Sequence, residues 1–196
     1  MIDTRALTWG PAGVAANQLT AIVTQGACAA VSATHATGLA VLALIGGLAN
    51  PSSGQILLDG HDVTADPAAR RRETFCAHPN LPALPVTVRE YLELASAGRR
   101  GSDAQRAATP AIADLDLTRR VDALDEAARQ TIGLAAALAS GAAILLLHTP
   151  FATGGADDHA RRRALITEAR HRGHTLLITG VNARDPLVDL TIEAGR

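Results

Sequence analysis

Hydrophobic and polar positions follow one another along the chain in blocks typical of an α/β protein. Short runs rich in β-branched and other apolar residues predict strands, and they occupy residues 5–9, 19–33, 54–60 and 174–180. Gln25-Gly26 interrupts the second run, which predicts a tight turn between two strands. The most hydrophobic short run, AAILLLHTP at 142–150, is typical of a central parallel strand covered on both faces.

Helical segments separate these strands. The apolar run Gly38 to Leu48 predicts a buried helix, and 65–72 predicts a short exposed one with Pro67 in its first turn. In the segment 87–97, Thr87 followed by Glu90 forms a capping-box pattern, which predicts a helix that begins at that threonine. Three further helices are expected at 102–113, 125–140 and 158–172.

The alternating order predicts one α/β domain that spans residues 1–196, closed by a strand within 187–195. We expect a mostly parallel central sheet with helices on both faces, an antiparallel β part near the start, and a helical subdomain inserted at about 88–139. The order of elements therefore favours a layered α/β fold over an all-helical or all-β one.

Composition narrows the functional classes. The formal net charge of −1 argues against a nucleic-acid-binding protein, because such proteins concentrate positive charge on one face. All 18 basic residues are arginine and none is lysine, so no side chain can supply the ammonium group of a phosphate-binding P-loop. A bias in genome composition would explain the same absence without any functional cause.

The cysteines and the start of the chain bear on the cellular compartment of the protein. Cys28 and Cys76 are too few for a disulfide framework, so we expect buried free thiols. The start of the chain lacks the basic and apolar regions of a secretory signal, and the longest apolar stretch, Gly38 to Ala49, is shorter than the roughly 20 residues that span a bilayer. These features predict a soluble, cytoplasmic protein.

Four segments in order resemble the nucleotide-binding domain of ABC transporters, whose fold is of the P-loop NTPase type. They are GGLANPSSGQILLDGHDV, LPALPVTVREYLELA, RQTIGLAAALASGAAILLLHTPFA and RGHTLLITG. The resemblance covers nearly the whole chain and implies an α/β ABC ATPase fold. It also allows the positions of the family's motifs to be located one by one.

The phosphate-binding loop of the family falls on SATHATGL, which contains His35. By this resemblance, Ser32 and Thr37 stand where the family has glycines, Gly38 stands for the lysine, and Leu39 stands for the hydroxyl residue that binds Mg²⁺. None of these side chains can perform the family's role. The resemblance therefore implies a degenerate nucleotide site.

The other motifs are also altered. After the apolar strand, His148 and Thr149 stand for the carboxylates that organise Mg²⁺ and the attacking water. His78 stands for the Q-loop glutamine, Gly180 for the switch histidine and Gly155 for the D-loop aspartate. The signature segment reads Leu124, Asp125, Glu126, Ala127 and Ala128, and its two carboxylates would repel a partner's γ-phosphate.

Our leading interpretation is a pseudo-ATPase, a structural or regulatory subunit of an ABC-type transport complex. ATP hydrolysis and Mg-ATP binding are not expected, and no cofactor is expected. Pairing with an intact ATPase would impair both nucleotide sites that the two subunits share, one through SATHATGL and the other through LDEAA. We expect peripheral attachment at the inner face of the cell membrane through a partner, either a membrane subunit or another ATPase-like subunit, including a second copy.

The resemblance implies a partner surface where the family receives a membrane subunit, and its candidate residues are His78, Leu84, Val86, Thr87, Glu90 and Tyr91. The alternative is that this stretch packs only on its own core.

Two other functions stay open. One is an ATP-binding subunit that retains nucleotide binding, for which Trp9 would stack on adenine or else serve as ordinary strand packing. The other is a Zn²⁺ or small-ligand site formed by His35, His78 and His148. The competing interpretation is that these are three unrelated loop histidines.

Overall fold

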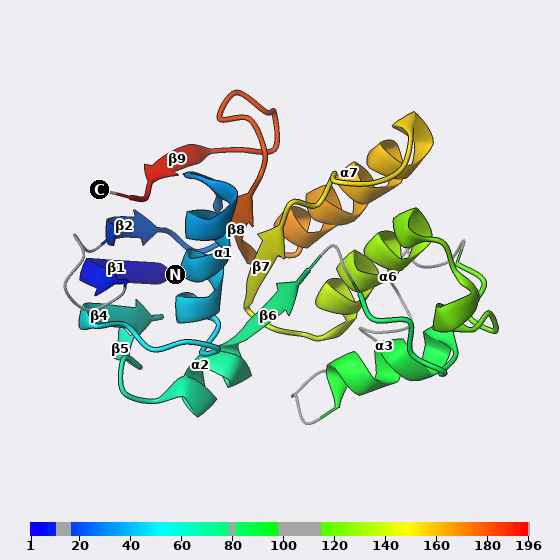
Figure 1. Cartoon of the computed structure of the whole chain (residues 1–196), viewed down its shortest axis with the longest axis horizontal. Coiled ribbons are helices and arrows are strands. Elements are labelled where there is room, and N and C mark those ends of the chain that lie inside the picture. Colours follow the sequence, from blue (N-terminus) through cyan, green and yellow to red (C-terminus); the bar gives the residue numbers. More distant parts are fainter. Residues whose placement is uncertain (11–16, 79–80, 98–114, 196) are drawn as a thin grey trace.

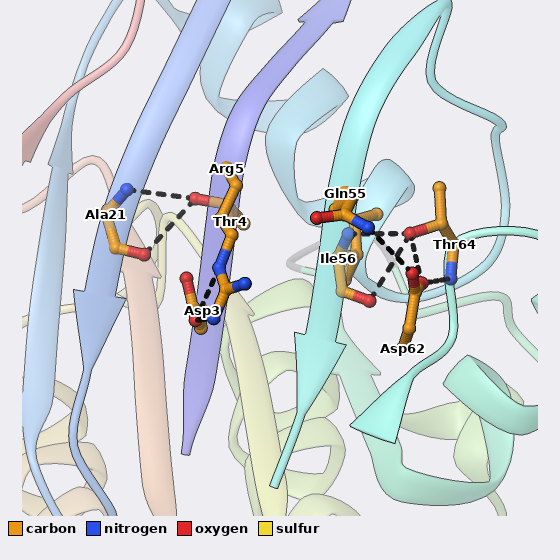
Figure 2. Close-up of polar contacts among 8 residues, drawn as sticks. All are labelled: Asp3, Thr4, Arg5, Ala21, Gln55, Ile56, Asp62 and Thr64. Carbon is orange, nitrogen blue, oxygen red and sulfur yellow. Dashed lines mark hydrogen bonds and ion pairs between the residues drawn. The ribbon is translucent and has the colours of Figure 1, made fainter. Parts of the chain in front are cut away.

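The computed structural model describes residues 1–10, 17–78, 81–97 and 115–195, and it contains two sheets (Figure 1). The smaller sheet is antiparallel with the order β2-β1-β4-β5. Its strands are β1 (Ile2–Trp9), β2 (Asn17–Val23), β4 (Ser53–Leu58) and β5 (His61–Asp62). Side-chain hydrogen bonds reinforce its pairing, as where the Thr4 hydroxyl both donates to and accepts from the backbone of Ala21 (Figure 2).

The larger sheet is parallel throughout and has the order β6-β7-β8-β3-β9. Its strands are β3 (Cys28–Ser32), β6 (Thr74–Ala77), β7 (Ile144–His148), β8 (Thr175–Thr179) and β9 (Leu190–Glu193). Every residue of β7 and β8 is buried, which confirms the prediction of a central strand covered on both faces. Cys28 is a buried free thiol and Cys76 a half-buried one.

Helices cover both faces of the parallel sheet. The helix α1 (His35–Ile45) lies between the two sheets, and its residues Val41, Leu42, Leu44 and Ile45 share one core with β1, β4 and β7. On the opposite face, α6 (Glu126–Ala139) and α7 (Ala156–His171) form a second core with β7 and β8 (Figure 1). The α/β fold with a parallel sheet and an antiparallel part is therefore as the sequence predicts.

Smaller elements complete the structure: α2 (Pro67–Glu73), α3 (Val88–Ser96) and a 3₁₀ turn at Val121–Ala123. A third, smaller core joins α3 to α6 through Val88, Val121, Leu124 and Ile132. The predicted helix at 102–113 lies outside the described residues. The helical subdomain at 88–139 runs through the same undescribed segment, so its extent stays a prediction.

The helix α1 differs most from its predicted bounds, because it begins three residues earlier than Gly38. Thr34 caps it, and its hydroxyl accepts a hydrogen bond from the backbone of Thr37. The helix ends at Ile45 because Gly46 and Gly47 follow, and Gly47 has a φ of 70°. Among the described residues, no helix combines the length and the apolar character needed to cross a membrane.

Candidate functional site

Three histidines meet at the carboxyl edge of the parallel sheet. His35 is the first residue of α1, His78 directly follows β6, and His148 is the last residue of β7. Ligand sites of open parallel sheets lie at this edge, because the carboxyl ends of the strands and the loops that follow them gather there. The sheet thus brings together residues from three segments that are far apart in the sequence.

Their rings are in direct contact. The ring centroid of His148 lies 4.5 Å from that of His35 and 5.2 Å from that of His78, the second pair being stacked at 28°. The Nε2 atoms of His148 and His35 are 3.3 Å apart. In the described part of the chain, no group of three or more His, Cys, Asp or Glu residues is arranged as it stands to hold a metal ion.

His148 lies at the centre of this cluster. Its side chain is 1% exposed, and its Nδ1 lies 2.6 Å from the Oγ1 of Thr179, the last residue of β8. Burial, and then the neighbouring His35 and His78, lower the pKa of His148 to about 4. Burial also lowers the pKa of His78. At neutral pH the cluster therefore holds His148 as an uncharged imidazole.

Thr179 also fills the space beside Gly38. Gly38 is buried in the first turns of α1, and a Cβ added to it would lie 3.1 Å from the Thr179 Cγ2 atom. This is the position that the resemblance assigns to the family's lysine. A residue from β8 thus occupies the space where a side chain would leave the helix, while Leu39 next to it is partly exposed.

The backbone after β7 is strained. Thr149 has a φ of 42°, which is uncommon for a β-branched residue. Its N–H donates to the Thr179 carbonyl (3.0 Å), and its own carbonyl accepts from Gln130 Nε2 (2.8 Å). Gly180 permits this close approach, since a Cβ there would lie 2.5 Å from Thr149 Cγ2. Such strain persists only where the surrounding contacts impose it.

A fully buried arginine holds the loop that follows. The guanidinium group of Arg162 donates to Gln130 Oε1 (2.6 Å) and to the carbonyls of Pro150 (3.1 Å) and Thr153 (2.8 Å). It also reaches the Ala127 carbonyl in the first turn of α6 (3.3 Å). Burial lowers its pKa. Arg162 therefore ties the loop after β7 to the segment that resembles the family's signature.

The signature-like segment serves as a helix start. Asp125 caps α6 by accepting from the backbone of Ala128 (2.7 Å), and Leu124 is buried in the third core. Asp125 and Glu126 are exposed. Both carboxylates thus stand on the surface, and Gly155 stands at the start of α7, exposed as well.

The candidate partner surface has a core side and an open side. Thr87 and Glu90 form the predicted capping box, which confirms the start of α3. Val86 and Tyr91 pack against the third core, and Leu84 is half buried. Leu94, on the same helix, is 60% exposed. The sequence did not single out Leu94, because an isolated leucine carries no signal of its exposure.

Sequence reasoning also missed Thr179, Gln130 and Arg162. Thr179 lies in a strand that reads as core, and Gln130 lies in a helix that reads as structural. Arg162 belongs to the arginine run 161–163, a pattern more typical of exposed surface. Their roles depend on contacts between distant segments, which no local pattern encodes. Trp9 is buried in the first core with 8% exposure.

Comparison with known proteins gives one family. No family model matches the chain. The taurine import ATP-binding protein TauB of Pseudomonas syringae pv. tomato is 34% identical over 136 residues, which cover 67% of this chain and 52% of that protein. The sulfate/thiosulfate import ATP-binding protein CysA of Caulobacter vibrioides is 33% identical over 140 residues, covering 66% of this chain and 40% of that protein. The chain thus spans about half the length of these curated relatives.

Solved structures share the fold. A putative ABC transporter ATP-binding protein from Pyrococcus furiosus superposes with a TM-score of 0.79 at 18% identity, over 98% of this chain and 96% of that one. The dimeric bacterial ABC transporter cassette MJ0796 gives a TM-score of 0.78 at 18% identity, over 98% and 94% of the two chains. The arrangement of both sheets and their helices is therefore that of an ATP-binding cassette.

Proposed function

The chain belongs to the ATP-binding cassette family of ABC transporters, and from this premise we propose that it acts as a pseudo-ATPase. It is a structural or regulatory component of an ABC-type transport complex and lies at the cytoplasmic face of the membrane through a partner. Its own contribution is a folded surface for protein partners, without turnover of nucleotide.

The contact between Gly38 and Thr179 is the observation that carries this proposal. A lysine at this position would need the Thr179 side chain to shift by a few tenths of an ångström, so the site as it stands is fitted to glycine. Thr179 also bonds His148, which stands for a metal-organising carboxylate. Two of the altered positions thus contact the same threonine, which supports the proposal that the site is settled in a different arrangement.

The site would also lack the charged groups that phosphoryl transfer requires. Phosphoryl transfer depends on positioning and on electrostatic stabilisation of the transferred group. The chain has no lysine, and a neutral His148 and Thr149 stand where carboxylates would organise Mg²⁺. A neutral imidazole is a poor ligand for a hard cation that prefers oxygen. We therefore propose that the chain neither hydrolyses ATP nor binds Mg-ATP tightly.

The second candidate is an ATP-binding subunit that retains nucleotide binding. Its support is the similarity to TauB and CysA, whose names describe ATP-binding import proteins. The amino end of α1 also carries the positive end of the helix dipole, which attracts anions, although the N–H groups of Thr37 and Gly38 already donate to Thr34. Mg-ATP is the ligand that separates the two candidates.

Titration calorimetry with Mg-ATP and Mg-ADP provides the test. We expect no saturable heat up to millimolar nucleotide, while a lysine-containing cassette measured alongside gives a micromolar Kd. A micromolar Kd for this chain would overturn the pseudo-ATPase proposal in favour of the second candidate. In that event, Trp9→Leu would show whether Trp9 stacks on the base.

The proposed partner is a membrane subunit that contacts α3, with its candidate surface at His78, Leu84, Val86, Thr87, Glu90 and Tyr91. Leu94→Arg places a charge on the open side of α3. Ile22→Arg is the matched control, because Ile22 is also 60% exposed but lies on β2 in the other sheet. We expect Leu94→Arg to reduce co-purification with a co-expressed ABC membrane subunit and Ile22→Arg to leave it unchanged. Equal retention by both variants would contradict docking on α3.

A further inference from the structure

We propose that His35 and His148 form two ligands of a binding site for a borderline divalent transition metal ion such as Zn²⁺. The inference goes beyond the proposed function and does not depend on nucleotide. Its starting point is the geometry of the two rings, whose Nε2 atoms face each other at the sheet edge.

The separation of these atoms fits a metal. Zn²⁺ binds imidazole nitrogen at about 2.0–2.1 Å in tetrahedral geometry, which places two ligand nitrogens about 3.3–3.4 Å apart. The two Nε2 atoms are 3.3 Å apart. An N–H donor normally lies about 2.7–3.2 Å from its acceptor, so the pair is wide for a direct hydrogen bond. The separation of the two nitrogens thus matches that of two ligands of one ion, and a reorientation of the rings would aim both lone pairs at it.

Thr179 supplies the outer contact that such a ligand needs. Metal-binding histidines almost always use their second ring nitrogen for a hydrogen bond, which fixes the ring and its tautomer. The Nδ1 of His148 lies 2.6 Å from Thr179 Oγ1. When Nδ1 donates its proton to this hydroxyl, Nε2 presents its lone pair toward His35. Thr179 is thus a positioning residue for the ligand atom.

His78 is the third ligand in this proposal. Its ring stacks on His148 at 5.2 Å between centroids, so a rotation of its side chain is required to bring a ring nitrogen to the ion. His78 is half buried and directly follows β6. Water completes a tetrahedral set, as in open zinc sites with three protein ligands.

The ligand chemistry selects the class of metal. Three imidazoles favour zinc, copper or nickel over Mg²⁺ or Ca²⁺, which prefer oxygen. The positive end of the α1 dipole lies beside His35 and opposes a cation. We therefore expect affinity in the micromolar range, below that of a closed structural zinc site.

Calorimetric titration of tag-free, chelator-treated protein with ZnCl₂ tests the site, and Co²⁺ absorption reports its geometry. We expect one ion per chain and the intense visible bands of tetrahedral Co²⁺. His35→Ala should weaken Zn²⁺ binding by more than about 100-fold, since losing a ligand costs more than losing its outer hydrogen bond. His35 is exposed, so this variant is expected to fold.

Two further variants distinguish the site from casual binding to surface histidines. Thr179→Val should weaken Zn²⁺ binding by about 10–100-fold, and Thr179→Ser should restore it. His61→Ala, at an exposed histidine of β5, should change nothing. Absence of stoichiometric binding, or equal binding by the wild type and His35→Ala, would overturn the proposal. Mg-ATP binding in the earlier test would overturn the pseudo-ATPase proposal, whereas the Zn²⁺ titration is made on nucleotide-free protein, so the two failures are distinguishable.

Discussion

The two ends of α1 differ sharply in how they are held. At the amino end, His35 is exposed and a single threonine, Thr34, caps the first turn. At the carboxyl end, a buried guanidinium group and a left-handed glycine fix the chain as it turns toward β4. The comparison teaches that the contacts that fix the turn after α1 are separate from those that place His35 at the sheet edge, so the two ends can be perturbed independently.

Arg70 is the centre of the carboxyl end. It is fully buried, and its guanidinium group donates to the carbonyls of Leu44 (2.5 Å) and Ala49 (3.2 Å) and to Asn50 Oδ1 (2.8 Å). A cation at this end also complements the helix dipole. The Leu44 carbonyl is buried and otherwise accepts only from the backbone of the helix end, while Ala49 and Asn50 are exposed, so Arg70 joins the buried end of α1 to the segment that follows it.

Arg70→Ala, at the carboxyl end of α1, should cause the largest loss of stability. It removes three hydrogen bonds and empties the space of a fully buried side chain, and we expect the free energy of unfolding to fall by about 3–5 kcal/mol. Denaturant unfolding measures it. Arg72→Ala is the control on the same helix, where an exposed ion pair to Asp66 at 3.9 Å is expected to contribute less than about 0.5 kcal/mol. Equal losses would mean that Arg70 does not hold the turn.

Gly47→Ala should have the next largest effect. A Cβ there would lie 2.4 Å from the Pro67 carbonyl oxygen, and its φ of 70° is costly for any L-residue with a side chain. We expect a loss of about 2–4 kcal/mol. Gly60→Ala shares the positive φ of 83° but meets nothing within 4 Å, so it isolates the backbone cost of about 1–2 kcal/mol.

At the amino end, stability should depend on pH through His148. Its folded pKa of about 4 lies below the ordinary value of 6.5, so between these values the unfolded chain binds a proton that the folded chain does not. Stability is therefore complete above pH 6.5 and falls as the pH drops toward 4. For metal-free protein this amounts to about 2 kcal/mol at pH 5, and we expect Tm to fall by about 4–8 °C between pH 7 and pH 5. A His148→Gln variant with the same slope would assign the effect to other groups.

Thr34→Ala should have the smallest effect. It removes the hydroxyl that accepts from the backbone of Thr37 at 3.2 Å, and we expect a loss of about 0.5–1 kcal/mol. Thr34→Ser keeps this hydrogen bond and should retain stability. A loss as large as that of Arg70→Ala would remove the contrast between the two ends.

Local sequence signals predicted the frame well. The capping box at Thr87 and Glu90 and the buried strand at 144–148 were visible because their causes lie within a few neighbouring residues. The early start of α1 was missed, because His35 and Thr37 have weak helix propensity and Thr34 alone supplies the cap. Arg70 and Arg162 were not predicted to be buried, because each belongs to a run of arginines, a pattern that is typical of solvent-exposed surface.

The candidate site was predictable only in part. The resemblance placed His35, His78 and His148 on loops that converge in the family, and the structure puts their rings in contact. Thr179 gave no such signal, since its contacts with Gly38 and His148 join strands and a helix that are far apart in the sequence. Side-chain contacts across a sheet edge depend on the whole fold and not on any local pattern.

The fit between Gly38 and Thr179 also bears on how substitutions at the two positions would combine. A side chain at position 38 would require the Thr179 side chain to shift by a few tenths of an ångström, and a change at Thr179 alone would remove its hydrogen bond with His148. The effects of changes at these two positions are therefore expected to be coupled, and a double-mutant cycle would measure that coupling.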